Sequence, residues 1–469
     1  MPLNYRHLLT TLVAVLSLTS AQAGVQAQDN LTNTLTRHLY TAVKKSPQPI
    51  RPFAVKYRPA LLERFLKYVS YNRQSSETES ITPNQIETAK KLYAEIKAMG
   101  LNVTLSEHYY IFVEIPSNLD REVPVLGYSA HYDVTPGIEA DNVQARIIPN
   151  YDGKPIVLEN NQVIDPEQPN GTYLSAQVGK MVITSDGKTI LGADDAAGLS
   201  VLMTFMQTLV ENPKRPHGKI QIVLAPNEDV GRAAEFVEET PYRPEIAFDF
   251  DGGSDGRVII ENFNARQELI TVAGIPGHQS YAATNGYRNA WTPACVLGSE
   301  ICPEELMPNF SSGRQGYAEL HHMSAPDGKV SSAELDVRLR GFDAEEMNRW
   351  EQHVDSTAAR IANQYDVKIS RKMVESYKNV AECAHPNALE ITKKAFENVN
   401  VNINIQTARA GTTAAMFVTK GLVGAYTIFT GQNNPHNYTE WLSEEDMYHS
   451  YLLSLSLMEE VAKQPASCK

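Results

Sequence analysis

At 469 residues, the chain exceeds the size at which a single hydrophobic core keeps growing, so we expect two domains. Hydrophobic residues make up 42% of the chain and charged residues 21%, which excludes a disordered or fibrous protein. A net charge of −13 without a local basic cluster argues against nucleic acid as a partner.

The first segment of the chain has the pattern of a secretory signal peptide. Arg6 and His7 precede the apolar stretch LLTTLVAVLSL, and small residues follow it. We expect cleavage after Ala23 or Ala27 and assign residues 1–27 to the signal peptide. The apolar run is too short to span a membrane. We therefore expect a periplasmic or secreted protein with no membrane span.

Five strand-like segments along the chain are followed by histidines or carboxylates. These side chains are, in chain order, His131 and Asp133, Asp194 and Asp195, Glu228 and Asp229, Asp251, and His436. Ligands of open α/β sheets collect at the carboxyl ends of the strands. We therefore expect the five loops to meet in one crevice.

The residue types in these loops favour a metal site. Histidine and carboxylate ligands without cysteine suit zinc, cobalt or manganese. A two-metal hydrolytic centre needs one carboxylate between ions about 3.5 to 4 Å apart. It also needs a free carboxylate that accepts a proton from water. The cysteines match no zinc motif, and we assign them no disulfide pairing; they are Cys295, Cys302, Cys383 and Cys468.

The pattern changes between Phe263 and Tyr377. The segments ARQELITVAGI and VSSAELDVRLRGF alternate like half-exposed strands. An apolar stripe at helical spacing is interpreted as core; it comprises Met347, Trp350, Val354, Ala358 and Ile361.

Six short motifs resemble the peptidase T, or aminotripeptidase, branch of the di-zinc metallopeptidases, a family that also includes aminoacylases and glutamate carboxypeptidases. The motifs are AHYDVTPG, ITSDGKTILGADDAAG, APNEDVG, FDFDGG, ENFNA and PHNYTE. The resemblance runs from Leu61 to about Met458. One such motif alone is a weak signal, whereas their order along the chain is specific.

The resemblance implies an α/β fold, in which a catalytic domain with a mixed sheet carries an inserted, smaller α+β lid domain of ferredoxin-like type. We assign residues 28–262 and 378–469 to the catalytic domain and residues 263–377 to the lid. The implied activity is hydrolysis of the N-terminal peptide bond of short peptides, tripeptides above all. The implied cofactors are two Zn²⁺ ions, for which Co²⁺ or Mn²⁺ can substitute. The oligomeric state stays open, and a homodimer is one state that the sequence allows.

The resemblance also assigns the metal ligands. His131 and Asp251 would hold the first zinc ion, and Asp229 and His436 the second. Asp194 would bridge the two ions.

Four further residues lie beside these ligands in the sequence. By resemblance, Glu228 is the general base and acid, and Asp133 accepts the other ring N–H of His131. Asp195 is interpreted as the N-cap of the following helix. Glu440 either stabilises His436 or forms a surface salt bridge.

Two residues match substrate-binding positions of the family. His278, in GIPGHQS, would donate a hydrogen bond to the scissile carbonyl oxygen, unless it is a structural histidine of the lid. Arg409, in ARAGTT, would grip the substrate carboxylate, unless it is a surface arginine. Arg340, in RLRGFD, also matches an arginine of the pattern and receives no role.

The chain departs from the family pattern beside the expected site. Ala196 stands where the family has lysine. Asp229 replaces a glutamate, so its loop must approach the metal more closely. Further departures lie in the specificity motifs; they are Gln279, Ser280, Ala410 and Thr413. The sequence therefore predicts the catalytic residues better than it predicts the substrate specificity.

Two alternative functions stay open. The first is a di-zinc amidohydrolase or carboxypeptidase that acts on N-acyl amino acids or dipeptides. The second is a non-catalytic protein that binds peptides. The complete ligand set together with Glu228 argues against the second, because a binding protein needs no base beside a metal.

Overall fold

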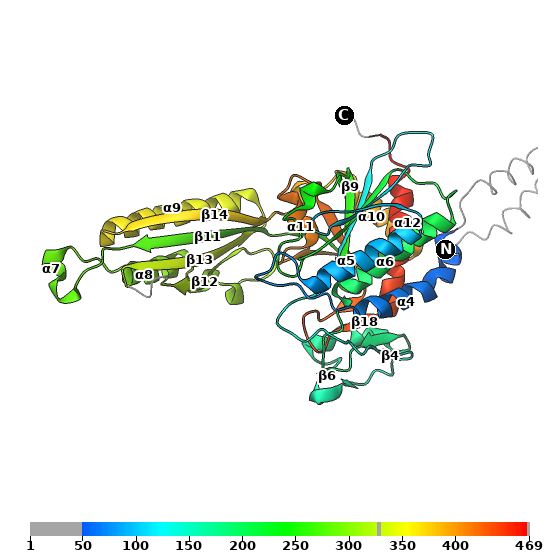
Figure 1. Cartoon of the computed structure of the whole chain (residues 1–469), viewed down its shortest axis with the longest axis horizontal. Coiled ribbons are helices and arrows are strands. Elements are labelled where there is room, and N and C mark those ends of the chain that lie inside the picture. Colours follow the sequence, from blue (N-terminus) through cyan, green and yellow to red (C-terminus); the bar gives the residue numbers. More distant parts are fainter. Residues whose placement is uncertain (1–48, 326–329, 467–469) are drawn as a thin grey trace, which may run out of the picture. The chain divides into compact units, whose positions relative to one another are not determined.

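The computed structural model describes residues 49–325 and 330–466 (Figure 1). The expected signal peptide, residues 1–27, lies outside these ranges, and so does Cys468. Within the two ranges, no helix is both long and apolar enough to cross a membrane. Three cysteines are free thiols; they are Cys295, Cys302 and Cys383.

The larger sheet is mixed, as predicted. Its strands, in spatial order, are β1 Asn102–Leu105, β2 Ile111–Ile115, β8 Ile220–Ala225, β3 Leu126–His131, β9 Ile246–Gly252, β16 Ala425–Phe429, β10 Arg257–Asn262 and β15 Asn404–Ala408. The adjacent strands β8, β3, β9 and β16 are parallel to one another. Strand β2 is antiparallel to β8, and β10 is antiparallel to β16. The carboxyl ends of the four parallel strands therefore meet at one edge.

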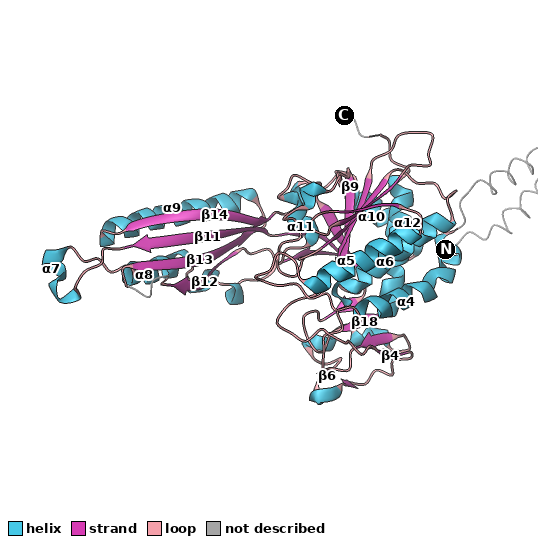
Figure 2. Cartoon of the chain, in the orientation of Figure 1, coloured by secondary structure: helices cyan, strands magenta, loops and turns pink. Residues whose placement is uncertain are grey.

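Helices bury both faces of this sheet. They are α3 Ile50–Ala54, α4 Arg58–Val69, α5 Pro83–Ala98, α6 Ala193–Glu211, α10 Ala388–Val399, α11 Thr413–Val418 and α12 Glu444–Val461 (Figure 2). In β8, Ile222 and Leu224 pack into the core formed with α4, α6 and α12, whereas Val223 packs into the core formed with α11. Because both faces are covered, the central strands β8, β3, β9 and β16 are buried along almost their whole length.

The segment between the two halves of this domain forms a separate four-stranded sheet. Its antiparallel strands, in spatial order, are β12 Tyr317–Ser324, β13 Ser332–Gly341, β11 Asn264–Ala273 and β14 Lys368–Tyr377. Helices α8 Trp291–Ile301 and α9 Ala344–Tyr365 pack on one face, and the short helix α7 Ala282–Asn285 follows β11. The predicted apolar stripe is the buried side of α9. The strand and helix order is that of the ferredoxin-like lid expected from the sequence.

A small third sheet connects two distant parts of the catalytic half. It contains β4 Arg146–Ile148, β7 Val182–Thr184, β18 Trp441–Ser443 and β17 Gln432–Asn433, and β5 Ile156–Val157 pairs with β6 Val163–Ile164 nearby. Strands β17 and β18 pair antiparallel, so the segment between them returns on itself. This segment carries His436 and Glu440.

Candidate metal centre

The structure brings all five predicted ligands together. His131 is the last residue of β3, and Asp251 lies at the end of β9. Asp229 follows the neighbouring strand β8, and Asp194 lies in the first turn of α6. His436 reaches the same place from the loop between β17 and β18. The convergence follows from the shared direction of the parallel strands, as the sequence predicted.

Asp194 lies between the two histidines. Its Oδ1 is 2.9 Å from Nε2 of His131, and its Oδ2 is 3.3 Å from Nε2 of His436. Oδ1 of Asp251 lies 3.6 Å from the same nitrogen of His131. Oδ1 of Asp229 lies 2.8 Å from Nε2 of His436. Each histidine thus lies beside one carboxylate of its own, and both histidines lie beside Asp194.

The electrostatics of these carboxylates fit a pair of cations. Burial raises the pKa of Asp229 to about 7, and the charge of Asp194 adds to this effect. Burial also opposes ionisation of Asp194, but hydrogen bonds with His131 and His436 hold its pKa well below its usual range. Oδ2 of Asp229 is buried and has no hydrogen-bond partner among the described residues. Divalent cations would neutralise this crowded set and would bind the free oxygen.

Asp133 connects two of the ligand loops. Its Oδ1 lies 3.3 Å from Nδ1 of His131, near the ring nitrogen that it is expected to orient, but the geometry does not form a hydrogen bond between them. Its two oxygens also accept the backbone N–H groups of Glu228, at 3.0 Å, and Asp229, at 3.2 Å. This second role was not predicted. Through these two bonds Asp133 holds the backbone of the loop that carries Asp229 and Glu228.

Glu228 lies at the wall of a pocket beside the ligands. The pocket has a volume of about 430 Å³, and Glu228, Asp229 and His436 form one side of it. Burial raises the pKa of Glu228 well above its usual value; the charge of His131 opposes this shift, and that of Asp251 adds to it. Because Asp133 binds the backbone N–H of Glu228, the carboxylate is held close to the ligands without being one of them.

Two acidic residues support the backbone around the ligands. Asp195 lies in the non-helical first turn of α6 and accepts the N–H of Gly198 at 2.8 Å, so it caps the regular part of the helix, which is the role predicted for it. Glu440 is fully buried and accepts the N–H groups of Gly192, at 2.6 Å, and Asp194, at 3.0 Å. Both interpretations of Glu440 were wrong, since it positions the bridging Asp194 instead of His436 and is no surface residue.

The structure does not bring His278 to the metal centre of its own chain. The first residue of β11, Asn264, hydrogen-bonds to Glu382 and Asn379 in the catalytic half. Because β11 is ten residues long, its far end lies on the order of 30 Å away. The short helix α7 lies beyond that far end (Figure 1). His278 precedes α7 in the chain, is exposed, and contacts Tyr281. His278 therefore lies far from the metal ligands of its own chain, and its contact with a scissile carbonyl stays a prediction.

Arg409 is occupied by contacts with the lid. Its Nη1 donates to the backbone carbonyl oxygens of Gly313, at 3.0 Å, and Gln315, at 2.7 Å. Its Nη2 donates to Oγ of Ser311 at 2.5 Å, and the guanidinium group lies 5.0 Å from the ring centroid of Phe263. The prediction that Arg409 grips the substrate is not supported, because these contacts use its donors and it does not line the pocket.

Two other arginines line the pocket from the lid. Arg338 and Arg340 lie on β13, and Gln267 lies opposite Arg338 on β11. Val337 and Leu339 point into the helix-covered core, so the arginines point to the opposite face. Arg340 matches a sequence motif without a predicted role, whereas Arg338 was not predicted as a site residue. The two-residue period of the strand is the signal that pairs them.

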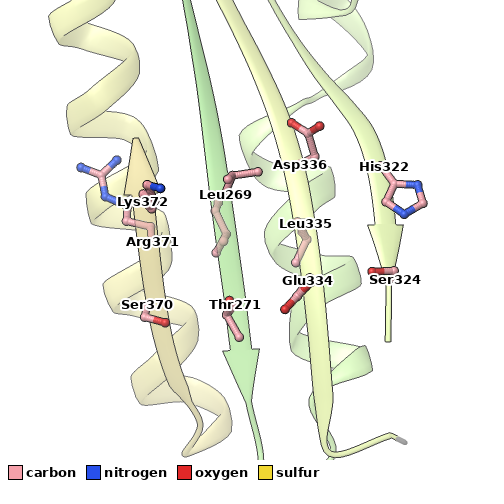
Figure 3. A pocket seen from close by; sticks show the side chains of 11 residues that line it. Leu269, Thr271, His322, Ser324, Glu334, Leu335, Asp336, Ser370, Arg371 and Lys372 are labelled. Carbon is pink, nitrogen blue, oxygen red and sulfur yellow. The ribbon is translucent and has the colours of Figure 1, made fainter. Parts of the chain in front are cut away.

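A second pocket lies farther along the same face of the lid sheet (Figure 3). Its volume is about 490 Å³, and its lining includes His322, Glu334, Asp336 and Lys372. Within the described ranges, both groups of side chains close enough to hold a metal contain His131. This second pocket is therefore not the metal centre.

Comparisons with known proteins agree with this geometry. Residues 185–460 match the model of peptidase family M20/M25/M40. A protein named Peptidase T from Listeria innocua is 34% identical over 396 residues, which cover 82% of this chain and 95% of that protein. Another Peptidase T, from Halothermothrix orenii, is 33% identical over 393 residues, covering 81% of this chain and 94% of that protein.

Solved structures show the same fold. The aminopeptidase PepT from Bacillus cereus superposes with a TM-score of 0.66 at 17% identity, covering 87% of this chain and 99% of that one. A dinuclear metal-binding peptidase of family M20 from Bacillus subtilis superposes with a TM-score of 0.61 at 13% identity, covering 87% of this chain and 99% of that one. Together with the sequence match, these findings make the chain a peptidase that belongs to the metallopeptidase family M20/M25/M40.

Proposed function

We propose that this peptidase removes the N-terminal residue of short peptides, tripeptides above all, with the help of two zinc ions. The observation that carries the proposal is the position of Asp194, whose two oxygens face the two histidines. The similarity to proteins named Peptidase T favours tripeptides over other substrates. The fold alone does not separate peptidases from amidases, because structures of both kinds resemble this chain.

The chain offers a complete set of residues for two ions. His131 and Asp251 would hold one ion, Asp229 and His436 the other, and Asp194 both. Zinc ions supply Lewis acids that polarise a carbonyl group and make water a stronger acid. Co²⁺ and Mn²⁺ accept the same nitrogen and oxygen ligands and are expected to substitute.

Glu228 would carry the proton during hydrolysis. Its carboxylate takes one proton from the attacking water while the water oxygen bonds to the peptide carbonyl carbon. It returns that proton to the leaving amine nitrogen as the C–N bond breaks. The raised pKa of Glu228 fits this double use, because the proton must be held between the two steps. Asp133 keeps Glu228 in reach of the ligands through its backbone N–H.

Arg338 and Arg340 would bind the carboxylate of the peptide. Both line the same pocket as Glu228 and His436, so a short peptide with its first bond at the ligands would have its carboxylate within this pocket. Guanidinium groups bind carboxylates with charge-assisted hydrogen bonds. Nη1 of Arg340 already donates to the carbonyl oxygens of Arg266 and Leu339, but its buried Nε has no hydrogen-bond partner among the described residues and would bind the carboxylate. The pair would take the role expected of Arg409, whose Nη1 and Nη2 both bind the lid.

A small substrate panel tests the proposed specificity. We expect the zinc-loaded enzyme to hydrolyse trialanine, and to lose about 10- to 150-fold in kcat/KM on the C-terminal amide, since a charged hydrogen bond contributes about 1.5 to 3 kcal/mol. N-acetyl-trialanine is expected to be a poor substrate, because an aminopeptidase needs the free amine. Faster hydrolysis of the acetylated peptide would instead support an acylase or carboxypeptidase, and would contradict the proposal.

A further inference from the structure

Arg73 is a buried cation directly behind the metal centre. It lies between α4 and α5 and is 1% exposed. Its Nη1 donates to the backbone carbonyl oxygens of Tyr132, at 3.1 Å, and Asp133, at 2.9 Å. Its Nη2 donates to the backbone carbonyl oxygen of Gly192. One guanidinium group therefore joins the loop after His131 to the loop before Asp194.

The backbone of Arg73 strengthens the same connection. Its carbonyl oxygen accepts the N–H of Val134 at 3.2 Å, and the N–H of Ser75 donates to the carbonyl of Val134 at 3.0 Å. The segment that carries Arg73 is thus paired with the loop after β3. A displacement of Arg73 would move the loop that holds Asp133 and, with it, the ring of His131.

Arg73 and Glu440 hold the loop before α6 from both sides. Arg73 binds the carbonyl of Gly192, and Glu440 binds the N–H groups of Gly192 and Asp194. The backbone that carries the carboxylate of Asp194 is therefore fixed by two buried, charged side chains. Arg73 binds its carbonyl group, and Glu440 binds its N–H groups. An arginine suits this place because its planar guanidinium group stays charged and can donate hydrogen bonds to several acceptors at once. The ammonium group of a lysine is a compact point charge and cannot span the same acceptors.

The positive charge of Arg73 lies near four carboxylate groups. Asp195, Asp133, Glu440 and Asp229 all lie near enough to interact with it electrostatically. Of these, only Asp229 is a proposed metal ligand. In the family pattern a lysine stands where this chain has Ala196. The backbone N–H of Ala196 lies 3.4 Å from the carbonyl oxygen of Gly192, which Arg73 also binds. Arg73 thus supplies a buried cation beside the first turn of α6, where position 196 of this chain carries none.

We propose that Arg73 is a positioning residue of the metal centre, which aligns the loops of His131 and Asp194 and balances the carboxylates behind them. The inference rests on the proposed metal centre, since its role is to organise the ligands before the ions bind. It does not touch substrate or ligand side chains, so it acts only through the backbone it holds.

The test compares three variants of the full chain, Arg73→Met, Arg73→Lys and Arg215→Met. Arg215 is the matched control, a buried arginine with 5% of its side chain exposed that pairs with Glu459 at 2.5 Å and lies over Phe53. Metal-free samples are titrated with Zn²⁺ against a chromophoric chelator and with Co²⁺ while the visible spectrum is recorded. Thermal unfolding of the metal-free proteins measures stability separately.

We expect Arg73→Met to bind Zn²⁺ roughly 10- to 100-fold more weakly than the parent, as for other residues that orient metal ligands. Its Co²⁺ spectrum should change, and Arg73→Lys should restore part of the affinity. Arg215→Met should unfold at a lower temperature while its metal affinity and Co²⁺ spectrum stay those of the parent. If Arg73→Met does not fold, Arg73→Lys carries the same comparison, with weaker Zn²⁺ binding and an altered spectrum as the expected result.

Two results would overturn the inference. One is parental Zn²⁺ affinity with a parental Co²⁺ spectrum in Arg73→Met, or in Arg73→Lys where only that variant folds. The other is an equal loss of metal affinity in Arg215→Met, which would show that any buried arginine has this effect. Both results leave the proposed function intact, because the parent still binds metal. A parent that binds neither ion would overturn the proposed metal centre and this inference with it.

Discussion

Replacing Glu228 with glutamine should lower kcat on tripeptides by about 10²- to 10⁴-fold, the range that a general base contributes. The amide keeps the size of the side chain but cannot take a proton from water. Metal content should stay that of the parent, because Glu228 lies beside the ligands and the backbone N–H that Asp133 binds is unchanged. The measurement is steady-state hydrolysis of trialanine together with the zinc content of the same sample.

Glu235 provides the control for this substitution. It lies on the same connection after β8 and is exposed, so Glu235→Gln removes a similar charge without touching the pocket. Parental activity is expected for this control. A Glu228→Gln enzyme that keeps its metal and hydrolyses trialanine as fast as the parent would show that another group moves the proton.

The second large effect is expected at Asp194. An asparagine there loses the charge that both histidines face, at 2.9 and 3.3 Å, and offers one oxygen instead of two. Residues that merely orient a ligand contribute about 10- to 100-fold to metal affinity, so a shared ligand should contribute at least about 100-fold. We expect Asp194→Asn to bind at most one ion under conditions where the parent binds two, and to lose activity accordingly.

Asp186→Asn is the matched control for the metal titration. Asp186 lies eight positions earlier and accepts the N–H of Lys188 at 2.9 Å, away from the ligand cluster. Its substitution should leave the number of bound ions unchanged. Full binding of both ions by Asp194→Asn would contradict a bridging role for this carboxylate.

The convergence of the ligand loops could be predicted from the sequence, because each loop follows a recognisable strand or begins a helix, whereas the choice of ligands among their side chains came from the resemblance to the peptidase T branch. His131 and Asp251 end apolar runs that the structure shows as the neighbouring parallel strands β3 and β9. The direction of parallel strands then places both side chains at one edge, whatever their separation along the chain. The lid was also predictable, since the two-residue alternation of β11 and β13 and the helical stripe of α9 are local patterns.

The substrate-facing residues could not be predicted in the same way, because their positions depend on contacts between distant segments. Arg409 matches a motif, but the loop that binds its guanidinium group lies more than 90 residues earlier in the chain. His278 also matches a motif, but the length of β11 carries it to the far end of the lid. Arg73 follows no period and no motif, and only the fold shows that its side chain reaches Gly192.

Anomalous diffraction from zinc-loaded crystals tests the central claim most directly. We expect two zinc peaks about 3.5 to 4 Å apart, with the Asp194 carboxylate between them. One peak should lie beside His131 and Asp251, and the other beside Asp229 and His436. A single peak with no carboxylate bridge, or zinc bound only away from these five side chains, would contradict the proposed metal centre.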